Sequence, residues 1–411
     1  MQISKQNLIN TLAYIIAAIF IFNCRSILGD AFSVGNIPNF VLWVATLLWV
    51  LIIYSSLSKK QFTKLWYCSV IWIVYIGLFL IFTSKKMNTI SLGISIFLFI
   101  WLVGTDYKND NIPVILDKYA KLMYIIAGIS LIFWILGSIL HIIHPTGIVF
   151  TGWTGNNRIV AVPSYYNLYF ETQTNAITMF NGISRNSAIF LEAPMAALNF
   201  SIALLINIYE SRYKNNKFSR VVLIIAILST LSMTAYIFLL ILFGIKTFYS
   251  KNNFLGKYRV FILPVIIIII GILGYIMLRE KFTNNIASAG VRANDYTVGF
   301  RAWMSHPIIG IGISNYDDLK NYMDLWRANN TGFSNSIMDV LSGGGLYLTV
   351  MYLFAYIRGF IVSKKAHNTY RIVFVVMMFY LFITTFFTYT YILLFILCWF
   401  ALESLPKSIG E

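Results

Sequence analysis

Runs of about twenty apolar residues, separated by short polar connections, recur along the whole chain. Each run predicts a membrane-spanning helix, because about 20 apolar residues in a helix cross the hydrocarbon core of a bilayer. The spans are expected near residues 8–28, 38–57, 66–84, 88–105, 119–143, 187–210, 219–232, 234–249, 260–278, 346–363, 371–386 and 389–404. The pattern therefore predicts an all-α polytopic integral membrane protein with about twelve transmembrane helices, forming a single membrane domain over residues 1–411.

Composition and charge agree with this interpretation. Hydrophobic residues make up 59% of the chain and charged residues only 11%, too few to cover the surface of a soluble protein of this length. The net charge of +16 does not indicate nucleic-acid binding, because basic residues gather in short connections between spans, namely 58–64, 211–220, 251–259 and 364–371. Such clusters are typical of cytoplasmic connections. We expect both termini in the cytoplasm.

Two connections are much longer than the others, residues 144–186 and 279–345, and the topology places both outside. Both are rich in aromatic residues, and long connections in compact proteins are commonly functional. In the second, residues 291–306 have helical spacing up to Pro307, and residues 315–329 predict a second amphipathic helix. These helices either lie on the membrane surface or form the walls of a cavity above the spans.

Arg185 and Glu192 are charged residues in a segment that is otherwise apolar enough to span the membrane. If the segment is helical, a separation of seven residues places both side chains on one face. Charge inside a bilayer costs roughly 3 kcal/mol per residue on insertion scales, so such a pair usually marks a site. Glu192 is expected to pair with an arginine or to act as a base, and Pro194 is expected to kink the helix.

Basic residues on the two long connections are not explained by topology. Six of the eight are arginine: Arg158, Arg185, Arg279, Lys281, Arg292, Arg301, Lys320 and Arg327. Arginine suits phosphate because its planar fork binds two oxygens at once. An external arginine cluster therefore favours an anionic lipid headgroup such as a lipid pyrophosphate. No Walker loop, H-E-x-x-H motif, Cys-rich pattern or external D-x-D motif is present, so we expect neither a metal nor another cofactor.

Three segments resemble motifs of the O-antigen polymerase and O-antigen ligase superfamily, also called Wzy/WaaL-like. SRNSAIFLEAPMA is similar to its R-x-x-G-x-x-x-E-P segment, with Ala188 in place of Gly and Pro194 one position late. GVRANDYTVGFRAWMSHPIIGIGISNY resembles its G-x-R…A…H-P-x-x-G-x-G block, and GFSNSIMDVLSGGGL its H-N-x-x-L…G-x-x-G-L block. Ser334 stands where ligases of the superfamily carry a histidine, which favours a polymerase.

The resemblance implies a GT-C-like bundle in the cytoplasmic (inner) membrane of a bacterium, with the site facing the periplasm. It also implies a glycan donor on undecaprenyl pyrophosphate, a lipid-linked repeat unit as acceptor, and a chain-length regulator as a partner protein. Arg185, Glu192 and Arg292 are the expected catalytic residues, with Glu171, Asp295 and His306 as other base candidates. Expected substrate-binding residues are Arg158, Tyr296, Arg301, Trp303, His306 and Asn335. A flippase for lipid-linked oligosaccharide and an O-antigen ligase are the alternative functions.

Overall fold

The computed structural model describes residues 5–31, 37–54, 57–106, 112–152, 160–173, 184–210, 216–249, 286–327 and 333–402, with scattered positions between 258 and 275. Among these residues, six helices are long and apolar enough to cross a membrane by length and composition. They are α1 (Lys5–Asn23), α3 (Ile37–Tyr54), α4 (Lys59–Phe82), α5 (Lys86–Asp106), α6 (Val114–Phe133, continued by a π-helical turn over Trp134–Ile139) and α14 (Ser336–Lys365).

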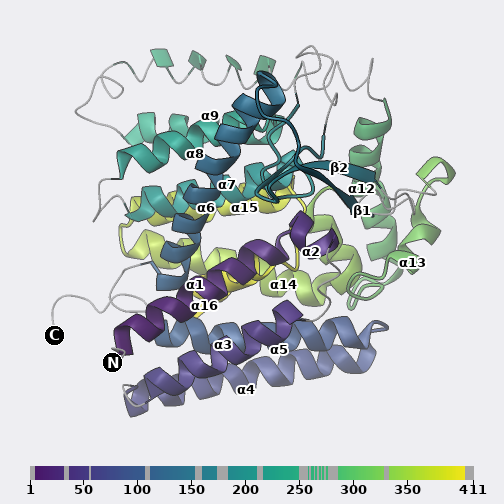
Figure 1. Ribbon diagram of the computed structural model, residues 1–411. Helices are drawn as coiled ribbons and strands as arrows, with labels where there is room; N and C mark the ends of the chain where they lie inside the picture. Colours follow the sequence, from purple (N-terminus) through teal and green to yellow (C-terminus); the bar gives the residue numbers. More distant parts are fainter. Residues whose placement is uncertain are drawn as a thin grey trace.

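Shorter helices complete the bundle. They are α7 (Ala193–Glu210), α8 (Lys217–Ser229), α9 (Met233–Tyr249), α15 (Thr369–Thr384) and α16 (Tyr391–Leu402), and most of them run alongside the longer ones (Figure 1). The predicted all-α, multi-pass membrane fold is confirmed. The span expected near 260–278 falls largely outside the described residues, so the count of twelve stays a prediction.

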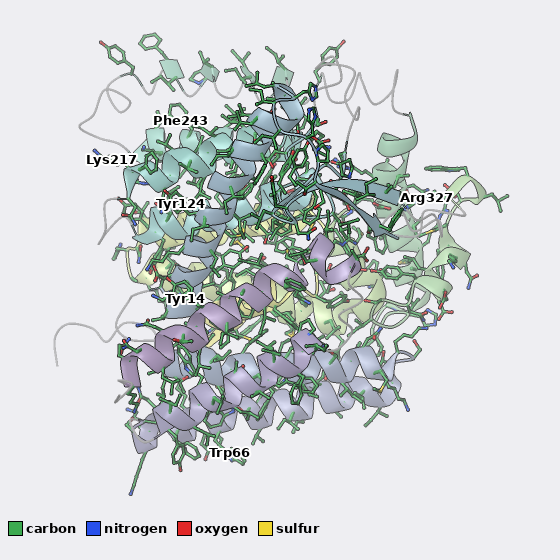
Figure 2. All side chains as sticks on the ribbon, in the orientation of Figure 1. Tyr14, Trp66, Tyr124, Lys217, Phe243 and Arg327 are labelled. Carbon is green, nitrogen blue, oxygen red and sulfur yellow. The ribbon has the colours of Figure 1, made fainter. Side chains whose placement is uncertain are left out.

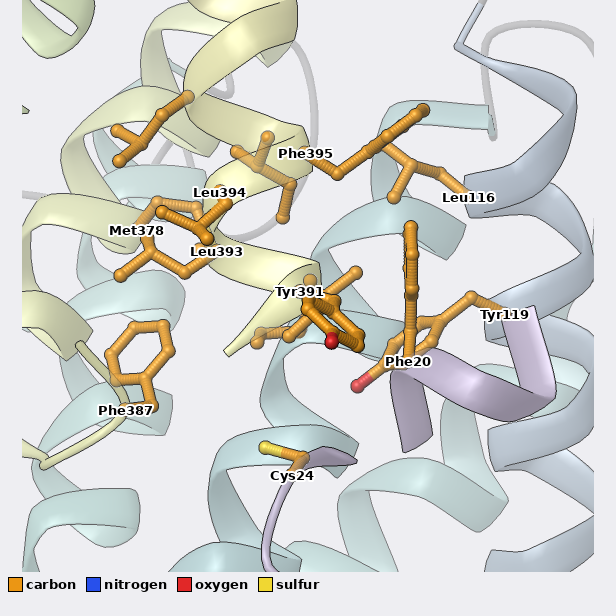
Figure 3. Close-up of a cluster of buried hydrophobic side chains, with 14 of the residues drawn as sticks. Phe20, Cys24, Leu116, Tyr119, Met378, Phe387, Tyr391, Leu393, Leu394 and Phe395 are labelled. Atoms are coloured by element: carbon orange, nitrogen blue, oxygen red, sulfur yellow. The ribbon is translucent and has the colours of Figure 1, made fainter. Parts of the chain in front are cut away.

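The centre of the bundle is apolar on every side. All residues of α16 from Tyr391 to Phe400 are buried, as expected for a helix that is hydrophobic all round. The ring of Phe20 lies 5.4 Å from that of Phe395 (Figure 3). It also lies 5.5 Å from the ring of Phe99. In contrast, only 22% of the most apolar window of α4 is buried, and Trp66 on this helix projects from the edge of the bundle (Figure 2). The outer face of α4 is therefore suited to contact lipid.

The start of α4 lies further toward the N-terminus than the span predicted near residue 66. A capping box begins the helix, because the Ser58 side chain accepts from the amide of Gln61 and the Gln61 side chain accepts from the amide of Ser58. The basic stretch that follows Ser58 thus forms the first two turns of α4 and is not a connection.

The first long connection contains a small antiparallel sheet that the sequence did not predict. Its strands are β1 (Gly147–Thr151), β2 (Val160–Tyr165) and β3 (Tyr169–Phe170), in the order β1-β2-β3. The sheet packs on the end of α6, where a Cβ atom added to Gly137 would lie 2.7 Å from the Tyr165 ring. The short helix α2 (Ile27–Ala31) lies beside β1 and β2 (Figure 1).

The second long connection contains α12 (Ile286–Ser305), which confirms the helix predicted before Pro307. This helix runs across the axes of most spans and lies at the same end of the bundle as α2 and the sheet (Figure 1). The second amphipathic helix predicted over 315–329 is wrong. In its place the chain forms α13 (Tyr316–Leu319) and two 3₁₀ turns over Lys320–Tyr322 and Leu325–Arg327.

Asp324 explains why that helix is interrupted. Its carboxylate lies between the two 3₁₀ turns and accepts from Arg301 at 3.0 Å and from Asn294 at 2.5 Å. Met323 just before it is extended, with ψ of 147°. These side-chain contacts hold the connection against α12 and oppose a continuous helix.

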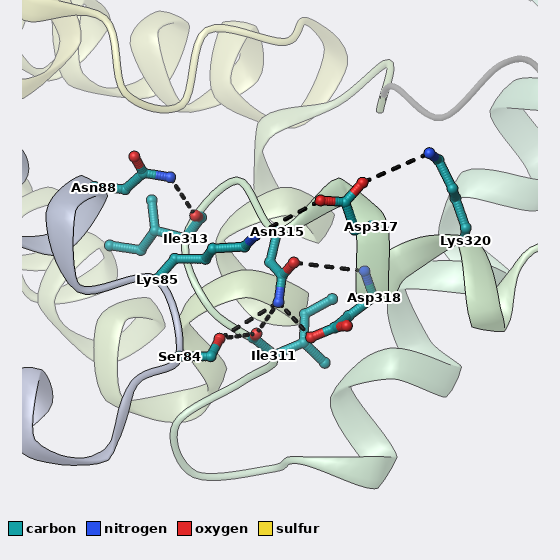
Figure 4. A network of polar contacts seen from close by, with 9 residues as sticks. All are labelled: Ser84, Lys85, Asn88, Ile311, Ile313, Asn315, Asp317, Asp318 and Lys320. Atoms are coloured by element: carbon teal, nitrogen blue, oxygen red, sulfur yellow. Dashed lines mark hydrogen bonds and ion pairs between the residues drawn. The ribbon is translucent and has the colours of Figure 1, made fainter.

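The second connection is also fastened to the hairpin between α4 and α5 (Figure 4). Ser84 donates to the carbonyl of Ile311 at 2.7 Å, and Asn88 donates to that of Ile313 at 2.9 Å. Lys85 pairs with Asp317 at 3.6 Å. These contacts fix the position of α13 relative to the spans.

Residues 307–312 of the second connection pack against a break in α14. Gly345 has φ of 59°, and a Cβ atom there would lie 2.4 Å from the carbonyl oxygen of Ile308, so glycine is required. The carbonyl of Ser342, near the break, accepts from the amide of Ile311 at 2.9 Å, which satisfies both buried groups. The glycine-rich stretch of residues 343–345 thus forms a docking site for residues 307–312.

Candidate functional site

The segment that carries Arg185 and Glu192 is not helical, which corrects the prediction that both lie on one helical face. Residues 184–192 form an irregular connection, and α7 begins only at Ala193. Pro194 lies in the first turn of α7, where a missing amide hydrogen breaks no hydrogen bond, so the predicted kink is wrong. Hydrophobicity predicted the span but could not locate its first turn.

Side chains from three parts of the fold hold this connection in place. Asn186 donates to the hydroxyls of Ser130 on α6 at 3.2 Å and Ser229 on α8 at 2.8 Å. Trp134 donates to the carbonyl of Ser184 at 2.7 Å, and Ser187 donates to a carbonyl at the end of β3 at 2.7 Å. The connection is therefore rigidly placed although it has no regular secondary structure.

Glu192 pairs with Arg25, a residue of the connection between α1 and α2. The distance from Arg25 Nη1 to Glu192 Oε1 is 3.2 Å, and the two side chains are 38% and 24% exposed. The guanidinium also lies 4.6 Å from the centre of the Phe386 ring. Arg25 was not among the predicted site residues because it fell inside the first predicted span. The criterion that selected Arg185, charge in an apolar run, would have found it.

Arg185 stands within electrostatic reach of both other residues predicted to be catalytic. Burial lowers the pKa of Arg185 to about 10, while Glu192 raises it and Arg292 lowers it further. Arg185 therefore stays charged at neutral pH. Its Nε donates to the carbonyl of Thr230 at 3.0 Å, which directs the side chain along the end of α8. The fold thus gathers Arg25, Arg185, Glu192 and Arg292 from separate connections and from α12.

A second arginine–carboxylate pair lies one turn further along α12. Asp295 accepts from Arg327 Nη1 at 2.6 Å, and both side chains are fully buried. The amide and hydroxyl of Ser334 donate to the other oxygen of Asp295, at 2.8 and 2.5 Å. Burial raises the pKa of Asp295, and these hydrogen bonds oppose that shift. Ser334, at the position of the ligase histidine, therefore belongs to a closed network.

Other residues predicted to bind substrate are spread along α12. Tyr296 is 44% exposed and lies within electrostatic reach of Arg292. Arg301 is exposed and pairs with Asp324 at 3.0 Å. Trp303 donates to the carbonyl of Pro307 at 3.1 Å and lies roughly 16 Å along the helix from Arg292, at 1.5 Å per residue. Of Tyr296, Arg301 and Trp303, only Tyr296 is shown to lie near Arg292.

The other three residues predicted to bind substrate are not seen beside the arginines. His306 is exposed just after α12, and its Nδ1 lies 2.9 Å from the hydroxyl of Ser305. Asn335 is buried and caps α14 by accepting from the amide of Met338 at 3.0 Å. Arg158 lies outside the described residues.

Two other groups bear on the chemistry of the site. Glu171, a base candidate, accepts hydrogen bonds from Ser138 and Tyr165 at the junction of α6 and the sheet. Across the described residues, no three His, Cys, Asp or Glu side chains are grouped so that they could hold a metal ion. The charged groups of the site are Arg25, Arg185 and Arg292, with the carboxylate of Glu192 and, within electrostatic reach of Arg25, that of Asp339. Arginines outnumber carboxylates in this group, an arrangement suited to bind an anion.

Comparison with protein families identifies a domain in the second half of the chain. Residues 218–353 match the family model described as O-antigen ligase. This part of the chain is similar to the O-antigen ligase family. The match supports the resemblance to the Wzy/WaaL-like superfamily and includes Arg292, Asp295, Arg327 and Ser334, whereas Arg25, Arg185 and Glu192 lie outside it. A comparison with curated proteins gives no match.

Proposed function

We propose that the protein is a surface polysaccharide polymerase. It transfers a growing glycan from undecaprenyl pyrophosphate to a lipid-linked repeat unit on the outer side of the cytoplasmic membrane. The observation that carries this proposal is the arginine cluster beside Glu192 at one end of a membrane-spanning bundle. The O-antigen ligase family domain supports an enzyme that acts on a lipid-linked glycan.

Charge stabilisation is the main demand of this reaction. A hydroxyl of the acceptor sugar attacks the anomeric carbon of the donor and gives up its proton to a base, for which Glu192 is a candidate. The bond to the lipid pyrophosphate breaks with its electron pair leaving on oxygen. Fixed positive groups around the leaving oxygen lower the barrier because they need not reorganise. Arg185 is held by the carbonyl of Thr230, which pre-positions it for this task, and Arg292 lies half-buried on α12 within electrostatic reach of Arg185.

The neighbouring groups fit the same reaction. The half-exposed ring of Tyr296 beside Arg292 is suited to pack against a sugar of either substrate. Ser334 is engaged with Asp295 and cannot provide an imidazole base, which favours the polymerase over a ligase that uses a histidine there. An O-antigen ligase is the second candidate, favoured by the description of the matched family.

The test is polymerisation by purified protein supplied with lipid-linked repeat units. The variant Arg185→Lys keeps the charge but loses the planar fork, and we expect it to lose about 90% or more of the activity, the effect of one charge-assisted hydrogen bond. A matched control is Lys121→Arg on α6. It also exchanges an ammonium and a guanidinium group without changing the charge, in an ion pair with Asp117. Normal polymerisation by Arg185→Lys would show that this residue does not bind the leaving group.

A further inference from the structure

Hydrogen bonds of the backbone, and not contacts of the side chain, fix the position of Arg25. Its carbonyl accepts from the amide of Leu191 at 3.0 Å, and the amide of Ile27 donates to the carbonyl of Ile189 at 2.9 Å. These bonds form an isolated antiparallel bridge between the α1–α2 connection and the segment before α7. The position of Arg25 beside Glu192 therefore does not depend on their ion pair.

The contact between the two side chains is limited. Only Nη1 of Arg25 makes a hydrogen bond within the part of the chain that the structure describes, although a guanidinium has five N–H donors. Both side chains are partly open to solvent, and water screens an ion pair in such a position. One face of the guanidinium rests on Phe386, which restricts its motion without using its donors.

The charges around Arg25 do not cancel. Glu192 acts on Arg185 as well as on Arg25, and Arg185 is in turn within reach of Arg292. Asp339 on α14 lies within electrostatic reach of Arg25. Among the residues that the structure describes, three arginines thus lie near two carboxylates, leaving an excess of positive charge. A pyrophosphate diester carries two negative charges and presents several oxygens to such a cluster.

We propose that Arg25 is a third phosphate-binding residue, which exchanges the Glu192 carboxylate for an oxygen of the donor's pyrophosphate when the donor binds. The single contact to Glu192 holds the guanidinium ready, and a phosphate that engages the planar fork makes a stronger contact than this one bond. This assignment rests on the proposed function, and it places three segments of the chain around one headgroup.

Binding by the full-length protein in detergent micelles tests the exchange. The two probes are undecaprenyl pyrophosphate in the micelle and inorganic pyrophosphate in solution. Arg25→Gln should weaken the binding of both probes about tenfold, the effect of one charge-assisted hydrogen bond. Glu192→Gln should bind both as tightly as the wild type or more tightly, because the competing carboxylate is gone. Lys121→Gln, which removes a charge from the Asp117 ion pair on α6, should leave binding unchanged.

A purely structural ion pair gives a different result. In that case Arg25→Gln and Glu192→Gln weaken binding equally or have no effect, and either outcome overturns the exchange. Arg25→Lys, which retains the pair with Glu192, separates misfolding from lost recognition and should still bind more weakly than the wild type. A loss with the lipid but not with inorganic pyrophosphate overturns the assignment to the headgroup. If the wild type binds and polymerises while Arg25→Gln binds equally well, only this inference fails. A wild type that binds neither probe contradicts the proposed function as well.

Discussion

Two arginine–carboxylate pairs at the same end of the bundle differ in almost every respect. Arg25 and Glu192 are joined by one contact of 3.2 Å and remain partly exposed. Arg327 and Asp295 are joined at 2.6 Å and have no exposed side-chain surface. Ser334 closes the second pair with two further hydrogen bonds. The first pair is therefore accessible to an anionic substrate, and the second is closed to it.

The difference in burial separates charges that stabilise the fold from charges that can bind a substrate. A buried pair is costly to break, because the remaining charge has no partner and no water. A partly exposed pair contributes little to stability and can be exchanged. Both pairs contain an arginine from a connection between spans, so residue type alone cannot separate the two roles.

The largest effect is expected at the buried pair. Arg327→Ala leaves Asp295 charged and buried, and we expect it to destabilise the protein by about 3–5 kcal/mol. Thermal unfolding in detergent measures the loss. Arg25→Gln is the matched variant of the open pair and should change stability by less than about 1 kcal/mol. Equal melting temperatures for the two variants would remove the distinction between the pairs.

A smaller effect is expected from the hydroxyl that closes the buried pair. Ser334→Ala removes the 2.5 Å hydrogen bond to Asp295 but keeps the bond from its own amide. The loss of one hydrogen bond to a charged group predicts a destabilisation of about 1.5 kcal/mol. The same unfolding measurement applies, and Ser305→Ala on the exposed end of α12 is a suitable control. If Ser334→Ala loses polymerisation activity at a temperature where the variant is still folded, Ser334 takes part in the reaction.

The smallest effect on stability is expected in residues 184–192, the connection that carries Glu192. Ala188 is buried with φ of 50°, a left-handed conformation that costs roughly 1 kcal/mol for a residue with a Cβ atom. Ala188→Gly should therefore raise stability by about 0.5–1 kcal/mol, although glycine also gains entropy in the unfolded chain. Ala203→Gly in the helical part of α7 should lower stability instead. A destabilising Ala188→Gly would mean that the methyl group is needed for packing.

Hydrophobic periodicity was sufficient to predict most of the spans and α12. It failed where polar side chains decide the backbone path, as in residues 184–192, where Asn186 and Ser187 bind neighbouring elements and prevent a helix. It also failed for β1–β3, because strands this short show no distinctive alternation of apolar and polar residues. Charge in an apolar segment selected Arg185 and Glu192, and the resemblance agreed with both and with Arg292, but no motif pointed to Arg25. Its role depends on a contact between residues far apart in the sequence.

The most direct test of the central claim is to identify the acceptor. Purified protein is incubated with labelled lipid-linked repeat units as the only substrate, and the products are separated by length. A polymerase gives a ladder that grows by one repeat unit, and Arg185→Lys removes most of it. If labelled repeats stay unjoined and transfer occurs only when a lipopolysaccharide core is added as acceptor, the protein is a ligase and the polymerase assignment is contradicted.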